Sequence, residues 1–335
     1  MNLSIADITS RARGAFYGLA LGDALGMPTQ SMSRSEIVQD YGAITRLVPA
    51  GPRQRIAAGM PAGAITDDTE QAVLLAELLV AGDGQIDPMV FATRLLEWER
   101  AMAAKGSLDL LGPSTKAAVQ MLADGGSVAE SGRFGSTNGA AMRITPVGIA
   151  HDSSDMSRFV DAVVEASAVT HNTTLGIGSA AAVGAAISAG VRGASQPETI
   201  EVAIAAATEG EKRGYWIAGG SIAQRTNWAV NYLKPLSRAE QINAVENVIG
   251  TSVASQESVV ATLALAAVTT DPWQSLCQAA EVGGDTDTIA AMLGAILGAR
   301  LGISAWPDTE IAILERVNSL KLNPLIDQLL HLRQN

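Results

Sequence analysis

Residues 283–300 read GGDTDTIAAMLGAILGAR, and this stretch indicates the architecture of the chain. From Ile289 to Leu301, apolar residues recur at the three- and four-residue spacing of an α-helix. Most positions between them hold Ala or Gly. Because small residues let helix backbones approach closely where side-chain ridges interlock, we expect this helix to pack tightly inside a larger helical assembly.

The same apolar spacing predicts further helices over Thr69–Val80, Met89–Met102 and Asp161–Val169. Alternation typical of strands is hard to find, and aromatic residues make up only 4% of the chain. The charge-free stretch from Asn172 to Val191 is about as long as a membrane span. It consists mostly of Ala, Gly, Ser and Thr, which favours a tightly packed buried helix instead. The expected fold class is all-α.

The composition bounds the remaining possibilities. With 335 residues, 47% of them hydrophobic and 17% charged, the chain can bury a large core, and without a linker-like segment we expect one domain over residues 1–335. A net charge of −11 with scattered Lys and Arg argues against nucleic acid as a partner. The single Cys277 allows no intramolecular disulfide, and Asp7 and Arg11 interrupt any secretory signal. We therefore expect a cytoplasmic protein with no membrane partner.

Paired carboxylates occur at two expected loop-to-helix junctions, in Thr66-Asp67-Asp68-Thr69-Glu70 and in Gly283-Gly284-Asp285-Thr286-Asp287-Thr288. Helix capping is one explanation, since Asp67 and Glu70 fit a capping box. However, a cap needs one acceptor, whereas each segment supplies two carboxylates within three residues. If the two segments meet, four carboxylates repel one another unless a cation neutralises them or their pKa values rise. Such oxygen ligands select Mg²⁺, Mn²⁺ or Ca²⁺ over zinc.

Together these motifs resemble the ADP-ribosylglycohydrolase family. TDDT near the end of the first fifth of the chain and GGDTDTIAAMLGAILGAR near its C-terminus match the family signature, and other segments follow in family order: GLALGDALGMP at 18–28, TNGAAMRITPVG at 137–148 and THN at 170–172. The resemblance covers about residues 11–302. It is nearest to bacterial members related to dinitrogenase reductase-activating glycohydrolase and ADP-ribosylarginine hydrolases.

This resemblance implies a compact orthogonal multi-helix bundle with a central dinuclear cleft that holds two Mg²⁺ ions, or Mn²⁺ in their place. The positions that match the family's metal ligands are Thr66, Asp67, Asp68, Asp285, Asp287 and Thr288. Asp67 and Asp285 are the expected catalytic carboxylates. The expected substrate-binding residues are Gln30, Asn138, Gly139, His171 and Ser252. For Asn138 and Gly139 an ordinary turn, and for His171 a structural role, remain alternatives.

The chain departs from the family pattern at three places. Gln30 stands where many relatives have a glutamate, and an amide cannot act as a general base. In GTSVASQESV at residues 250–259, Ser252 and Val253 replace a glycine and an aromatic residue, which weakens the case for full ADP-ribose. Asp109 lies off the position of a further family aspartate, so no role is assigned to it. Asp23, in the GDALG turn expected to end the first helix, is expected to satisfy local backbone donors.

Three functions remain open from the sequence. The leading one is Mg²⁺-dependent hydrolysis of an ADP-ribosyl N-glycosidic bond on a protein or small molecule. The first alternative is a nucleoside N-ribohydrolase, and the second is a non-catalytic ADP-ribose-binding or crystallin-like protein. ADP-ribose requires donors for its pyrophosphate, for which Arg133, Arg143 and Arg225 are the candidates.

Overall fold

The structure is a computed structural model that describes residues 3–104 and 112–334. Every regular element within these residues is a helix, and the only β-type contacts among them are three isolated bridges. The expected all-α class is therefore confirmed. Asp109 lies outside the described residues.

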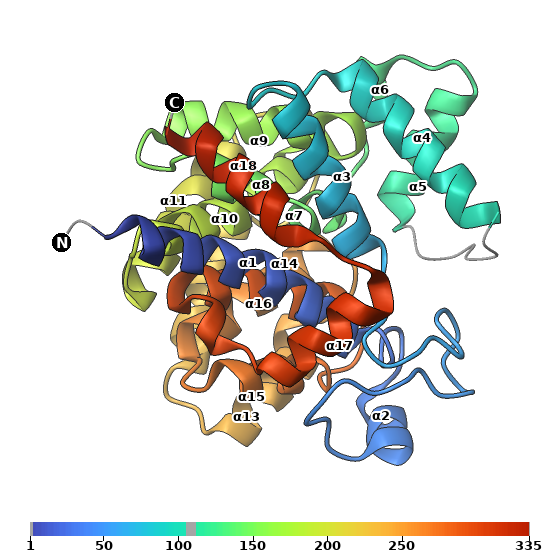
Figure 1. Ribbon diagram of the computed structural model, residues 1–335, viewed down its shortest axis with the longest axis vertical. Helices are drawn as coiled ribbons and strands as arrows, with labels where there is room; N and C mark the ends of the chain where they lie inside the picture. Colours follow the sequence, from blue (N-terminus) through green and yellow to red (C-terminus); the bar gives the residue numbers. More distant parts are fainter. Residues whose placement is uncertain (1–2, 105–111, 335) are drawn as a thin grey trace.

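The helices are drawn in chain order in Figure 1. Their bounds are α1 Ile5–Gly26, α2 Arg34–Tyr41, α3 Asp67–Ala81, α4 Pro88–Ala104, α5 Pro113–Ala123, α6 Val128–Ser131, α7 Gly139–Met142, α8 Thr145–Ala150, α9 Met156–His171, α10 Thr174–Val191, α11 Gln196–Gly210, α12 Ile222–Leu233, α13 Arg238–Ala244, the π-helix η1 Val245–Ile249, α14 Ser255–Val268, α15 Pro272–Ala279, α16 Thr286–Leu301, the 3₁₀-helix η2 Ile303–Ala305, α17 Asp308–Asn318 and α18 Leu322–Gln334.

The four helices expected from apolar spacing are confirmed as α3, α4, α9 and α16. Each is longer than its periodic stretch, and α9 begins five residues before Asp161. The charge-free stretch becomes α10, the one helix among the described residues with the length and apolar character of a membrane span. Of its 18 residues, 94% are buried inside the protein. This burial agrees with the expectation of a core helix.

α1 and α16 form the central antiparallel pair, which crosses the middle of Figure 1. Their backbones touch because α1 carries glycine at every fourth position: Gly14, Gly18, Gly22 and Gly26. A Cβ at Gly22 would overlap the carbonyl oxygen of Ala290, and one at Gly26 would overlap the Asp287 backbone. The C-terminal end of α1 is thereby fixed against the beginning of α16.

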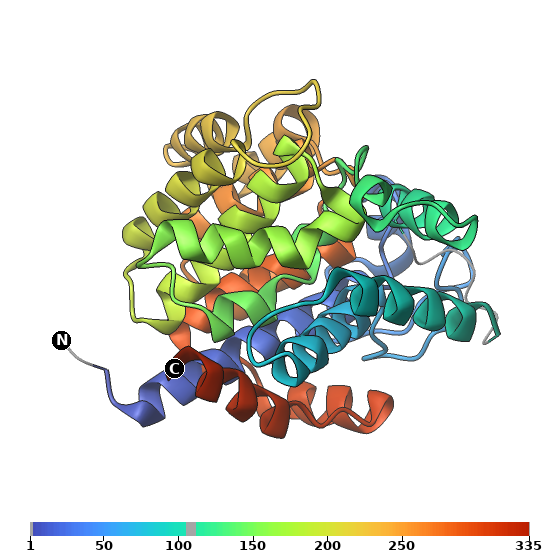
Figure 2. The same ribbon diagram turned by 90° about the horizontal axis from the view of Figure 1, so that it is seen from above.

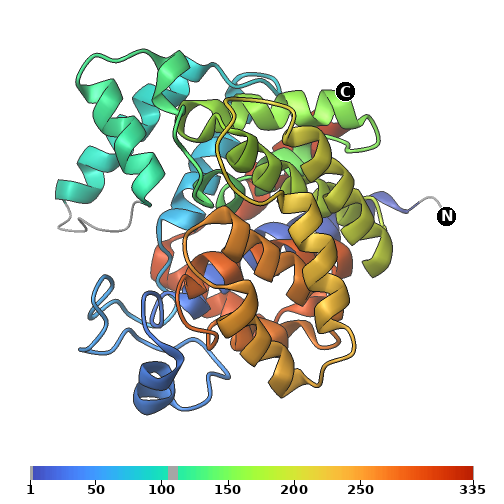
Figure 3. The same cartoon turned by 180° about the vertical axis from the view of Figure 1, so that it is seen from behind.

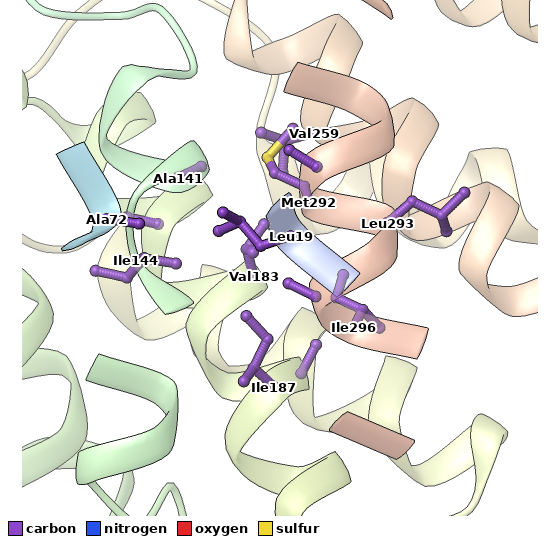
Figure 4. Packing of buried hydrophobic residues seen from close by; sticks show 14 of the residues in the cluster. Leu19, Ala72, Ala141, Ile144, Val183, Ile187, Val259, Met292, Leu293 and Ile296 are labelled. Atoms are coloured by element: carbon purple, nitrogen blue, oxygen red, sulfur yellow. The ribbon is translucent and has the colours of Figure 1, made fainter. Parts of the chain in front are cut away.

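The apolar core surrounds this pair. Leu19 of α1, Val183 of α10 and Ile296 of α16 converge in it, and Ala72 of α3 lies near Ile144 (Figure 4). α17 and α18 lie along α1 on the outside (Figure 2). α4–α6 and the segment containing α2 lie at one side of the molecule (Figure 3). The α2 segment also contacts α15, since the Trp273 indole donates a hydrogen bond to the Thr45 carbonyl oxygen.

Candidate active site

The two carboxylate-bearing junctions meet at the N-terminal ends of α3 and α16. Thr288 Oγ1 donates a hydrogen bond of 3.3 Å to Asp68 Oδ2, across 220 residues of sequence. Thr66 Oγ1 donates to the same oxygen over 3.2 Å. All three residues are at most 4% exposed. The α1–α16 contact and the packing of α3 against both helices bring these junctions together.

Helix capping does not account for the carboxylates. The N-cap of α3 is Thr66, whose side chain accepts from the Asp68 backbone, so the alternative explanation, an Asp67–Glu70 capping box, is wrong. Glu70 instead accepts a hydrogen bond from the Trp98 indole. Asp285 precedes α16 but makes no side-chain capping bond. The negative charges at both junctions therefore exceed what the helix ends require.

Asp23 adds a fifth carboxylate, fully buried near the end of α1. Its oxygens accept from the backbone N–H and the hydroxyl of Thr66, at 3.0 and 2.8 Å, and from the backbone N–H and hydroxyl of Thr69. α1 continues through the expected GDALG turn and ends at Gly26. Asp23 thus satisfies donors more than 40 residues away and not the local ones expected from the sequence, and it holds the first turn of α3 in place.

The cluster is electrostatically strained. Burial raises the pKa of Asp23 and of Asp285 to about 6. Burial and the charge of Asp287 raise the pKa of Asp68 well above its usual range, and burial together with neighbouring carboxylates does the same for Asp67 and Asp287. Among the described residues, Asp68 Oδ1 and Asp287 Oδ1 are buried without any hydrogen-bond partner. Buried anionic oxygens without partners call for a proton or a cation.

The donor set suits a hard divalent cation, although no group of three or more His, Cys, Asp or Glu side chains in residues 3–104 and 112–334 is already arranged to hold a metal ion. Two of the six expected ligands are the threonines Thr66 and Thr288, which would contribute hydroxyl oxygens. The remaining four are aspartates. Oxygen donors of this kind fit Mg²⁺ or Mn²⁺.

A cavity of about 250 Å³ opens onto the cluster. The expected site residues that line it are Gln30, Asp67, Asn138, Gly139, Asp285, Asp287 and Thr288. Thr66 and Asp68 lie behind this lining, buried against Asp23 and Thr288. Three carboxylates therefore face the cavity, and the fourth supports them from the interior.

The Asn138–Gly139 segment contacts the carboxylates directly. Asn138 Nδ2 donates to Asp285 Oδ2 and to Ser258 Oγ, so this amide orients Asp285. The absence of a side chain at residue 139 has a packing reason, since a Cβ there would lie 2.9 Å from His171 Cε1. Gly139 also lines the cavity, so its role in substrate binding stays a prediction.

His171 and Ser252 lie outside the cavity lining. His171 is fully buried, and its two ring nitrogens pair with Thr170 Oγ1 at 2.7 Å and Thr137 Oγ1 at 2.9 Å. Burial lowers the His171 pKa well below its usual value, which keeps the ring neutral. Ser252 accepts from the Ala254 backbone through its hydroxyl, whereas the neighbouring Val253 does line the cavity.

Gln30 lies at the cavity edge and is 7% exposed. Its Nε2 is buried without a partner. Its backbone is held by the amide of Gln54, which donates to the Gln30 carbonyl over 2.9 Å, and the next residue, Ser31, donates to the Gly284 carbonyl. A side-chain amide with spare donor capacity therefore lies beside the carboxylates, on a backbone that hydrogen bonds hold in place.

None of the three arginines expected to bind a pyrophosphate lines the cavity. Arg133 is at the surface, paired with Glu130, and Arg225 donates to the backbone carbonyls of Gln256 and Ile249. Neither lines the cavity, and Arg143 is buried behind it. Lys116 of α5 does line the cavity. It follows no motif, so no sequence signal identified it, whereas the GDALG motif could have identified Asp23.

The sequence model described as ADP-ribosylglycohydrolase matches residues 4–335. An uncharacterised protein of Escherichia coli K12, YegU, is 34% identical over 97% of this chain and 98% of its own length. An ADP-ribosylarginine hydrolase, Tri1 of Pseudomonas putida GB-1, is 27% identical over 89% of this chain and 72% of its own length. Among solved structures, an ADP-ribosylglycohydrolase-related protein complex has a similar fold, with a TM-score of 0.67 at 23% identity over 98% of this chain and 99% of that one.

Proposed function

Because the chain belongs to the ADP-ribosylglycohydrolase family, whose members hydrolyse ADP-ribosyl bonds, we propose that it cleaves an ADP-ribosyl N-glycosidic bond in a Mg²⁺-dependent reaction. The observation that carries this proposal is the convergence of Asp67, Asp285 and Asp287 on one cavity from the beginnings of α3 and α16. The substrate is an ADP-ribosylated protein or small molecule.

The residues that would hold two Mg²⁺ ions are the four aspartates of the junctions with the hydroxyls of Thr66 and Thr288. The partnerless Asp68 Oδ1 and Asp287 Oδ1 support this assignment, because a divalent cation removes both their desolvation cost and their mutual repulsion. When bound, Mg²⁺ supplies positive charge that orients ribose hydroxyls and acidifies a water molecule.

The protein's own groups then carry the proton and the developing charge. Asp67 accepts a proton from the water that attacks the anomeric carbon. At the same time the bond from that carbon to nitrogen breaks, and the nitrogen departs with the bonding electron pair and takes up a proton from solvent. The carboxylates facing the cavity stabilise the oxocarbenium-like transition state. Asn138 holds Asp285 in position toward the sugar.

Substrate contacts beyond the ribose come from the rest of the lining. Gln30 offers an amide donor, Val253 an apolar surface, and Lys116 a positive charge suited to a phosphate.

The test is hydrolysis by purified protein of ADP-ribosylarginine beside a panel of nucleosides, with Mg²⁺ and with EDTA. Mg²⁺-dependent release of ADP-ribose supports the proposal. Release of free ribose from a nucleoside would replace it with the nucleosidase alternative, and no turnover of any substrate would favour a binding protein. Asp67→Asn and Asp285→Asn should each lower kcat by a factor of about 10² to 10⁴, the usual range for a proton-transfer group.

A further inference from the structure

Arg143 is the one Lys or Arg side chain among the described residues that is fully buried. It lies between α7 and α8, with its guanidinium 5.1 Å from the Phe91 ring centroid. Nη1 donates over 2.9 Å to Gln71 Oε1, and Nη2 donates to Thr170 Oγ1. Burying a guanidinium is costly unless anions or acceptors compensate it, and the nearest anion along this chain of contacts is Asp67.

Gln71 connects Arg143 with Asp67. It lies one turn after Asp67 on α3, is fully buried, and donates from Nε2 to Asp67 Oδ2 over 3.1 Å. The hydrogen bond from Arg143 determines the orientation of the Gln71 amide. A guanidinium only donates, so Gln71 must turn its oxygen toward Arg143 and its N–H₂ group toward Asp67. The Gln71 N–H₂ group is therefore always directed at Asp67, because a reversed amide would satisfy neither Arg143 nor Asp67.

We propose that Gln71 and Arg143 are positioning residues, which act through Asp67 to hold one of its oxygens in place and leave the other for the cavity. This inference rests on the proposed function. Arg143 also contributes a buried positive charge behind Asp67, and the polarised amide of Gln71 transmits its effect. Its pKa is lowered to about 9 by burial, so it keeps its charge at neutral pH, and the charge of Asp67 favours that state.

A purely structural role is the competing explanation, since Arg143 also ties α3 to α9 through Gln71 and Thr170. Such a role predicts lower thermal stability with unchanged metal affinity of the folded protein. A positioning role predicts a change in the affinity of the Asp67 site itself, because partners that orient metal ligands typically contribute about 10- to 100-fold to metal affinity.

The experiment measures the equilibrium affinity for Mn²⁺, used as a probe in place of Mg²⁺, by electron paramagnetic resonance of folded protein. Gln71→Met keeps the side-chain volume and removes the donor. Its matched control is Gln120→Met, because Gln120 is an exposed helical glutamine that donates over 3.0 Å to Asp124, four residues further on. We expect Gln71→Met to weaken Mn²⁺ binding about 10- to 100-fold and Gln120→Met to leave it unchanged. If Gln71→Met does not fold, Gln71→Asn, which is one methylene too short to span both partners, should give the same direction.

Arg143→Lys tests the second step. If Arg143 acts through Gln71, this substitution weakens Mn²⁺ binding in the wild-type background and adds little in the Gln71→Met background. Unchanged Mn²⁺ affinity in both Gln71 variants, or additive losses in the double variant, would overturn the inference while leaving the proposed function intact. A wild-type protein that binds no Mn²⁺ would overturn the proposed function itself, and the inference with it.

Discussion

Gly22 of α1 and Ala290 of α16 are in direct backbone contact, and a Cβ on Gly22 would overlap the Ala290 carbonyl oxygen. This contact repeats at each glycine along α1 and ends where Gly26 meets Asp287. The spacing between the two helices therefore sets the position of the carboxylate cluster as well as the packing of the core.

Gly22→Ala should destabilise the protein by about 3 kcal/mol or more, because a backbone carbonyl cannot move aside as a flexible side chain can. Chemical denaturation measures the change. Gly112→Ala is the control, since a Cβ there has no neighbour within 4 Å. Equal stability of the Gly22→Ala variant and the wild type would mean that α1 and α16 are further apart than described.

The metal-free protein should lose stability as the pH rises. The folded-state pKa values of Asp23 and Asp285, about 6, lie above the unfolded value near 4, so the folded state binds more protons in that interval. Their contribution is complete below about pH 4 and is lost as the pH passes through about 6. Thermal denaturation in EDTA from pH 4 to 8 should show this loss more strongly in the wild type than in Asp285→Asn. If the thermal stability of the two proteins depended on pH in the same way, Asp285 would not contribute to this loss.

Asp285→Asn should be more stable than the wild type at pH 7.5 in EDTA, by roughly 1–3 kcal/mol, since it removes one buried charge from a repelling cluster. Addition of Mn²⁺ should stabilise the wild type more than the variant, because binding to the folded state raises apparent stability. Thermal denaturation of the wild type and of Asp285→Asn, each with and without Mn²⁺, measures both differences. A variant less stable than the wild type under both conditions would indicate that Asp285 serves mainly as a structural group.

Asp23→Asn should weaken the beginning of α3. One of the two anionic acceptors becomes an amide donor facing the N–H and hydroxyl groups of Thr66 and Thr69, at a cost of about 1–3 kcal/mol. We expect lower stability together with weaker Mn²⁺ binding, measured by denaturation and by paramagnetic resonance. Normal Mn²⁺ affinity in a destabilised variant would show that the α3 junction is positioned without Asp23.

Gln30→Glu should strengthen Mn²⁺ binding and, in EDTA at pH 7.5, lower stability by about 1 kcal/mol or more, because it adds a carboxylate at the edge of the cluster. Gln85→Glu adds the same charge at an exposed position and serves as the control. A Gln30→Glu variant with unchanged Mn²⁺ affinity would place this side chain outside the reach of the ions.

The sequence by itself determined the helices and the two acidic junctions. Apolar spacing identified α3, α4, α9 and α16 because a helix is encoded locally, by residues three and four apart. The excess of carboxylates over capping needs was likewise visible at Asp67, Asp68, Asp285 and Asp287. Motif order was enough to identify the family.

Only the tertiary structure decided how these pieces act together. Asp23 proved to support α3 from 43 residues away, Lys116 to face the cavity, and His171 to be enclosed between threonines. The sequence could not separate Arg143, buried behind Asp67, from Arg133 at the surface, because burial and hydrogen-bond partners depend on contacts between distant segments. Local pattern fixes which face of a helix is apolar, whereas the site depends on which helix ends the packing of α1 against α16 brings together.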